Sequence, residues 1–126
     1  MLGIVTVNGL PTPAAIAIGA IAGVLARWGV FGLLDDTLDD GRTIVVNAVG
    51  CLLMGLFVRQ GWRDDLHAAA TVGFCGGLTT FSTFALDSAI YFEQSDWLQG
   101  VIYVAATVLV SAITYLVGRQ LAGAPA

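Results

Sequence analysis

Hydrogen-bond donors are concentrated in one segment of this otherwise apolar sequence. Segment 73–84 reads Gly-Phe-Cys-Gly-Gly-Leu-Thr-Thr-Phe-Ser-Thr-Phe, so Ser82 and Thr83 lie between Phe81 and Phe84. Hydroxyl groups can donate to a small anion, and the edges of phenylalanine rings carry partial positive charge. This combination predicts a path for a small anion, although packing alone is the commoner role of phenylalanine in an apolar helix.

Polar residues at helical spacing extend the pattern to two other segments. Thr43 and Asn47 are four residues apart and share one face of a helix. Tyr103, Thr107 and Ser111 recur at the same spacing near the end of the chain. Taken singly, each of these residues is more typical of a hydrogen bond between packed helices. Because three segments contribute, we expect a narrow hydrophilic track through an apolar structure.

The elements that position these residues are predicted to be transmembrane helices. The chain has 126 residues, of which 57% are hydrophobic and 11% charged, whereas roughly a quarter of the residues in soluble domains are charged. A helix crosses the hydrocarbon core with about 20 apolar residues. The sequence offers four such stretches, separated by short polar turns. We therefore expect an all-α membrane protein, one domain over 1–126, with spans at about 14–34, 43–62, 66–92 and 97–118.

The third predicted span is poor material for a regular helix. Gly76 and Gly77 are adjacent and threonines follow them, and both residue types lower helix propensity. Broken helices at membrane depth occur where the freed backbone faces protein, an ion or water. The alternative is an ordinary glycine-rich helix whose hydroxyls bond to their own turn, and composition does not decide between the two. The pairs Gly19/Gly23 and Gly73/Gly77 are spaced for close helix packing.

Several functional classes are disfavoured. His67 is the only histidine, no nucleophile–base pair or metal cluster accompanies it, and Cys51 and Cys75 fall in apolar segments, so we expect neither an enzyme nor an organic cofactor. The chain has no lysine and no basic cluster, which argues against nucleic acid. A four-helix drug or cation exporter is a further alternative. It would need a carboxylate in its first span, and none precedes Asp35.

Three motifs carry a resemblance to a known family. They are Gly-Val-Leu-Ala-Arg-Trp at 23–28, Thr-Ile-Val-Val-Asn-Ala-Val-Gly at 43–50 followed by Gly55, and segment 73–84. In these motifs, and in size and order of spans over essentially the whole chain, the sequence resembles the Fluc (CrcB) fluoride channels. Trp28 departs from the tyrosine that the family usually has at that position.

The resemblance implies a fluoride-selective channel that exports cytoplasmic fluoride passively and gives fluoride resistance. Such a channel is a multi-pass protein of a prokaryotic cell membrane, and an antiparallel, dual-topology dimer with two pores. Its third helix is broken mid-membrane. The carbonyls of Gly76 and Thr79 match the ligands of one structural sodium ion. Arg27 and Asp87 match charged positions near the pore ends. The residues matching the fluoride pathway are Asn47, Phe81, Phe84, Ser82, Thr83, Thr43, Tyr103, Thr107 and Ser111.

The arginines predict how the chain inserts. With four spans, Arg59, Arg63 and Arg119 lie on the side of the termini, and Arg42 and Arg27 lie toward the other side. Orientation follows the Lys/Arg bias of short loops, and three against two is close to balance. We therefore expect insertion in both orientations, as an antiparallel homodimer requires. The slight excess is also compatible with one subunit of a heterodimer with a homologue.

Overall fold

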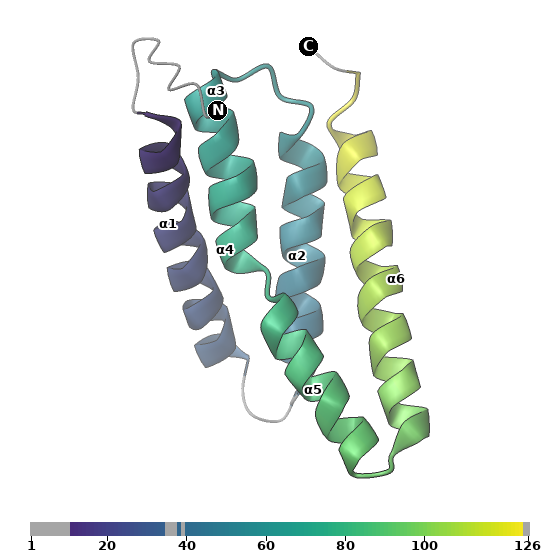
Figure 1. The fold of residues 1–126 in the computed structure, drawn as a ribbon. Coiled ribbons are helices and arrows are strands. Elements are labelled where there is room, and N and C mark those ends of the chain that lie inside the picture. The colour runs from purple at the N-terminus through teal and green to yellow at the C-terminus, as the bar shows by residue number, and fades with distance from the viewer. Residues whose placement is uncertain (1–10, 35–37, 39, 125–126) are drawn as a thin grey trace, which may run out of the picture.

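The computed structural model describes residues 11–34, 38 and 40–124, and every regular element in them is a helix. Two long helices and one interrupted helical segment run alongside a shorter helix, and the start of α1 and the end of α6 lie at one end of the bundle (Figure 1). The elements are α1 Thr12–Leu33, α2 Gly41–Phe57, α3 Asp64–Ala68, η2 Ala69–Cys75, α4 Gly76–Leu78, α5 Phe81–Glu93 and α6 Trp97–Leu121.

The helices are long and apolar enough for a multi-pass membrane protein. Among the described residues, three helical segments meet both criteria for a membrane span: Thr12–Leu33, Asp64–Glu93 and Trp97–Leu121. The remaining helix, α2, is apolar but has 17 residues, which is at the short end of the range for a span. The structure thus contains three or four candidate spans.

Some helix ends differ from the sequence prediction. The second helix ends at Phe57 rather than continuing to Trp62. The Gln60 side chain donates to the Leu56 carbonyl at 3.0 Å, and the Trp62 ring packs 5.3 Å from that of Phe57. These contacts turn the chain back toward the helix end. The last helix continues to Leu121 rather than ending near 118.

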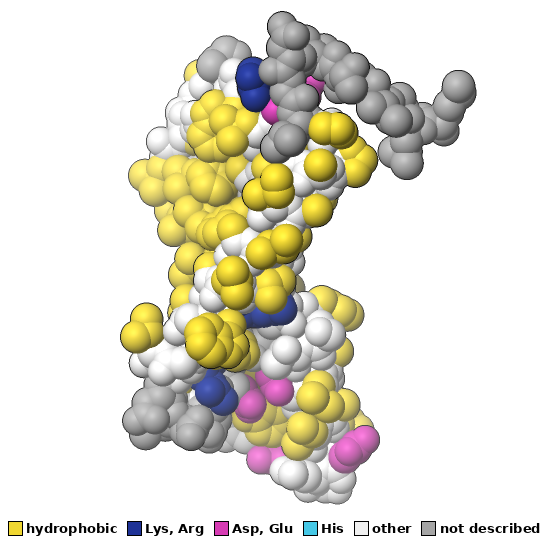
Figure 2. All heavy atoms as spheres, turned by 90° about the vertical axis from the view of Figure 1, so that its left-hand side faces the viewer, with side chains coloured by type: hydrophobic (Ala, Val, Ile, Leu, Met, Phe, Trp, Pro, Cys, Tyr) yellow, Lys and Arg dark blue, Asp and Glu magenta, His cyan; other side chains and the backbone are white. Residues whose placement is uncertain are grey.

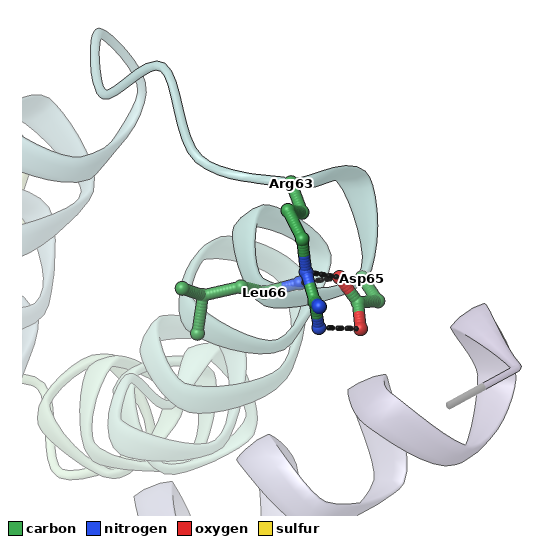
Figure 3. Close-up of polar contacts among 3 residues, drawn as sticks. All are labelled: Arg63, Asp65 and Leu66. Atoms are coloured by element: carbon green, nitrogen blue, oxygen red, sulfur yellow. Dashed lines mark hydrogen bonds and ion pairs between the residues drawn. The ribbon is translucent and has the colours of Figure 1, made fainter. Parts of the chain in front are cut away.

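The predicted polar turn before the third segment is present. Arg63 contacts the Asp65 carboxylate through both Nε and Nη2, at 3.2 and 2.8 Å (Figure 3). Asp65 Oδ1 also accepts the backbone N–H of Leu66 at 2.9 Å. The carboxylate therefore satisfies one of the free N–H groups at the start of α3, and an acidic group at a helix N-terminus is favoured electrostatically.

Glycines let the helices approach closely, as their spacing predicted. A Cβ at Gly19 or Gly23 would collide with backbone of η2, at the carbonyls of Ala69 and Phe74 respectively. On the facing segment, a Cβ at Gly73 or Gly77 would come 2.5 Å from a backbone carbonyl of α1. The two glycine pairs therefore pack against each other's helices, and close packing is what holds helices together in lipid.

Large apolar side chains cover the outside of the molecule. Figure 2 looks onto the α1 side and shows hydrophobic side chains over most of that face, with acidic side chains gathered toward its lower end. Trp28 of α1 is 78% exposed and Leu25 is 61% exposed. In a soluble protein so much exposed apolar surface would promote aggregation. On a membrane protein it faces lipid or a partner chain.

Candidate ion pathway

Helical geometry stops at Leu78 and resumes at Phe81. Between them, Thr79 (φ −82°, ψ 158°) and Thr80 (φ −143°, ψ 112°) have extended backbone. Thr80 serves as the N-cap of α5, because its Oγ1 accepts the N–H of Thr83 at 3.1 Å. Threonine is a favoured N-cap residue. The N–H and hydroxyl of Thr79 both donate back to the Cys75 carbonyl, at 3.0 and 2.9 Å.

Asn47 of α2 pairs with the backbone of this interruption. Its Oδ1 accepts the Thr80 N–H at 2.7 Å, and its Nδ2 donates to the Thr80 carbonyl at 3.2 Å. Asn47 is 9% exposed and Thr80 is 5% exposed. Buried backbone groups need hydrogen-bond partners, and one amide side chain here supplies both a donor and an acceptor.

Arg27 of α1 donates a hydrogen bond to the same interruption. Its Nη1 donates to the Thr79 carbonyl at 2.9 Å. The resemblance placed Arg27 near a pore end. In the structure Arg27 contacts the extended residues between α4 and α5, and its place near a pore end stays a prediction.

Asp87 of α5 is the acceptor for two hydroxyl groups. Its Oδ2 accepts the Thr43 hydroxyl of α2 at 3.1 Å and the Tyr103 hydroxyl of α6 at 2.9 Å. Three predicted residues from three helices therefore meet at one oxygen atom. Thr43 and Asp87 border a cavity of about 330 Å³, whose lining also includes Thr83 and Arg42.

Aromatic rings line the side of this cluster. The Phe84 ring lies 5.6 Å from that of Phe81 and 5.8 Å from that of Tyr103, and both pairs are tilted. Phe81 is 78% exposed, so one edge of the pair faces outward from this chain. Tilted pairs leave ring edges free to approach an anion.

The remaining predicted residues lie apart from the Asp87 cluster or in open positions. The Thr107 hydroxyl donates to the Tyr103 carbonyl within its own helix, at 2.8 Å, and Ser111 is a hydrogen-bond partner of the Cys51 side chain. Ser82 is exposed, 3.3 Å from the Thr80 hydroxyl. Gly76 is also exposed, and a Cβ built on it meets no heavy atom within 4 Å.

Comparison with known proteins identifies the family. Residues 14–119 match the family described as CrcB-like protein, Camphor Resistance (CrcB). The chain belongs to the CrcB family.

Relatives in this CrcB family carry the name fluoride-specific ion channel FluC. One from Synechocystis is 36% identical over 122 residues, covering 90% of this chain and 93% of the relative. One from Dehalococcoides mccartyi is 31% identical over 114 residues, covering 84% and 88%. One from Ignicoccus hospitalis is 31% identical over 112 residues, covering 85% and 91%.

Sequence reasoning missed the contacts that Thr80 makes within the interruption. Thr80 caps α5, pairs with Asn47, and its hydroxyl lies 3.0 Å from that of Thr83. One signal was available, since a threonine before a helical stretch is a common N-cap. Its pairing with Asn47 joins residues 33 positions apart, and no local pattern reports such a contact.

Proposed function

We propose that the chain is a fluoride-selective channel, which exports cytoplasmic fluoride passively down its electrochemical gradient and gives fluoride resistance. The observation that carries this proposal is the convergence of neutral donors from α2 and α6 on one carboxylate oxygen, beside the tilted rings of Phe81 and Phe84. The names of the CrcB relatives support fluoride as the ion.

The donors suit an anion that must be bound and then released. The hydroxyls of Thr43 and Tyr103 point at Asp87 Oδ2, so they already serve a negatively charged oxygen and can serve a fluoride ion in turn. Asn47 uses one Nδ2 hydrogen on the Thr80 carbonyl, and an amide nitrogen carries two. Several moderate donors along a path favour conduction, because an ion held too tightly does not leave.

Passive transport is sufficient for export. A membrane potential of 100 mV, negative inside, drives a monovalent anion outward with about 2.3 kcal/mol. Fluoride also enters cells as its neutral acid and accumulates where the interior is more alkaline. A channel that conducts fluoride therefore lowers its cytoplasmic concentration without ATP.

The functional unit in this proposal is an antiparallel, dual-topology dimer, with the interruption at Thr79 and Thr80 at mid-membrane. The outward-facing ring of Phe81 would meet the second chain there and complete the pore wall. The near balance of arginines supports insertion in both orientations. A homodimer is the simpler form, and a heterodimer with a homologue is the alternative. Reporters on the C-terminus that are active on opposite membrane faces distinguish the two, because a homodimer requires signal from both.

A structural sodium ion is part of the proposal, and the residues present fit it. In a continuous helix the Thr80 N–H would donate to the Gly76 carbonyl, but here it donates to Asn47. The Gly76 carbonyl is thereby released, and a Cβ built on this residue would meet no heavy atom within 4 Å. The Thr79 carbonyl accepts from Arg27 and has a second lone pair. Gly76 and Thr79 would hold the ion, and its charge would offset part of the cost of an anion in a low dielectric. Because Arg27 adds a positive charge beside Thr79, Gly76 is the better placed ligand.

Fluoride efflux from liposomes that contain only this chain tests the proposal. Efflux should follow a potassium diffusion potential set with valinomycin and should reverse when the potential is reversed. Efflux that follows a proton gradient and ignores the potential would support the exporter alternative. Efflux that appears only after a homologous chain is added would support the heterodimer.

A further inference from the structure

The two extended residues of the interruption are held from two different helices. Arg27 of α1 donates to the carbonyl of Thr79, and Asn47 of α2 pairs with both backbone groups of Thr80. These contacts join residues 52 and 33 positions apart. Both contacts lie within one chain.

Asn47 replaces helix hydrogen bonding at Thr80. A regular helix would direct the Thr80 N–H to the carbonyl four residues earlier, which is that of Gly76. The carboxamide of Asn47 has the same donor and acceptor groups as a peptide unit and takes that N–H at 2.7 Å. The side chain therefore competes directly with continuation of the helix.

We propose that Asn47 and Arg27 are positioning residues that set the interruption within a single chain, before any cation or second chain binds. Arg27 orients the carbonyl of Thr79, and Asn47 fixes the start of α5, which carries Phe81 and Phe84. The geometry stands on these contacts alone. Its consequence for conduction rests on the proposed function.

Two other causes of the interruption make different predictions. The Thr80 side chain caps α5 through the Thr83 N–H, and this cap alone would hold the interruption without Asn47. A bound cation would hold it only in the presence of the ion. The chemical shifts of the Thr79 carbonyl and the Thr80 amide can distinguish these causes.

The sequence provides a single reporter for this measurement. Thr79 and Thr80 are the only adjacent threonines in the chain. Protein labelled with carbonyl-13C and 15N threonine therefore gives one Thr–Thr peak in an HNCO spectrum. That peak reports the Thr79 carbonyl and the Thr80 amide together, which are the groups bonded to Arg27 and Asn47.

Substitutions at Asn47 and Arg27 should shift this peak along different spectral dimensions. Asn47→Ala should shift the Thr80 amide proton upfield and speed its exchange with solvent, because the short bond to Oδ1 is lost. Asn47→Asp keeps an acceptor oxygen and should keep most of the downfield position. Arg27→Met should shift the Thr79 carbonyl carbon and leave the amide proton nearly in place.

Matched controls remove comparable groups elsewhere. Ser88→Ala deletes a hydroxyl that bonds to the Phe84 carbonyl within α5, and Arg59→Met deletes an arginine that donates to the carbonyl of Gly123. Neither residue contacts the interruption through these bonds, so the Thr–Thr peak should stay in place in both variants.

Two results would overturn the proposal. The first is a Thr80 amide that does not move in Asn47→Ala, which would leave the Thr80 cap as the cause. The second is a wild-type amide that moves to a helical position in sodium-free buffer, which would make the cation the cause. The comparison of spectra with and without sodium uses the wild-type protein, so it gives a result even where a variant fails to fold. The spectra do not depend on fluoride flux. A failure of the proposed channel function, which a flux assay would detect, is therefore distinguishable from a failure of this inference.

Discussion

The Tyr103 hydroxyl lies 2.9 Å from Asp87 Oδ2 and donates a hydrogen bond to it. Asp87 belongs to α5 and Tyr103 to α6, so this bond joins the two helices that follow the interruption. The Thr43 hydroxyl of α2 reaches the same oxygen. A negatively charged oxygen thus already occupies a position at which neutral donors from two helices converge, and a mobile anion would compete with it for these donors.

Removing one of these donors should slow fluoride without unfolding the protein. Tyr103→Phe deletes the hydroxyl and keeps the ring that packs 5.8 Å from Phe84. Because a hydrogen bond to a charged group contributes about 1.5 kcal/mol or more, we expect the fluoride flux to fall by about tenfold. Flux is measured by a fluoride electrode, and Tyr115→Phe, on the same helix, is the control. Equal flux in wild type and Tyr103→Phe would remove Tyr103 from the pathway.

The aromatic pair should act through its ring edges. Ile at Phe81 or Phe84 keeps apolar bulk and removes the quadrupole. Interactions of this kind contribute roughly 1 kcal/mol, so each change should lower flux by about fivefold while the protein elutes as the same oligomer. Phe57→Ile is the matched control, because Phe57 packs on Trp62 at the far end of α2. If both test variants conducted like the control, the rings would serve packing alone.

Asn47→Asp should impair conduction more than the loss of one neutral donor does. The substitution keeps the size of the side chain, removes the Nδ2 donor that bonds the Thr80 carbonyl, and places negative charge where the anion should dwell. We expect a drop of at least about tenfold in flux, since like-charge repulsion in a low dielectric adds to the lost bond. Flux that is unaffected by Asn47→Asp would mean that fluoride does not pass this residue.

Glycine packing should determine stability in a position-specific way. A Cβ at Gly23 would collide with the Phe74 carbonyl, whereas a Cβ at Gly29 of the same helix meets no heavy atom within 4 Å. Overpacking costs about 1–3 kcal/mol, so Gly23→Ala should lower the melting temperature in detergent. Gly29→Ala should leave it unchanged or raise it slightly, because alanine favours helix by up to about 1 kcal/mol. Equal melting temperatures for the two variants would contradict the packing described for α1.

The sequence was informative where a signal is local or periodic. The spacing of Gly19 and Gly23 predicted a close helix contact, and that contact is present. The four-residue spacing of Thr43 and Asn47 predicted one shared face, and both side chains point into the same interhelical region, toward Asp87 and Thr80. Such patterns follow from helix geometry, which neighbouring residues determine.

Contacts between distant helices were not predictable in the same way. The bond from Arg27 to the Thr79 carbonyl depends on how α1 packs against the interrupted segment, and neither residue signals its partner. Thr107 shares the spacing of the polar stripe, but its hydroxyl is used within its own helix. Spacing gives the face on which a residue lies, and the packing of the other helices determines its partner.

The reversal potential between fluoride and chloride directly measures whether this chain selects fluoride. Purified protein in a planar bilayer is given fluoride on one side and an equal concentration of chloride on the other. A fluoride-selective channel should give a reversal potential displaced far from zero, and the current should collapse when fluoride is replaced by chloride on both sides. A reversal potential near zero with sustained current would mean equal permeation of both anions and would rule out a fluoride-selective channel.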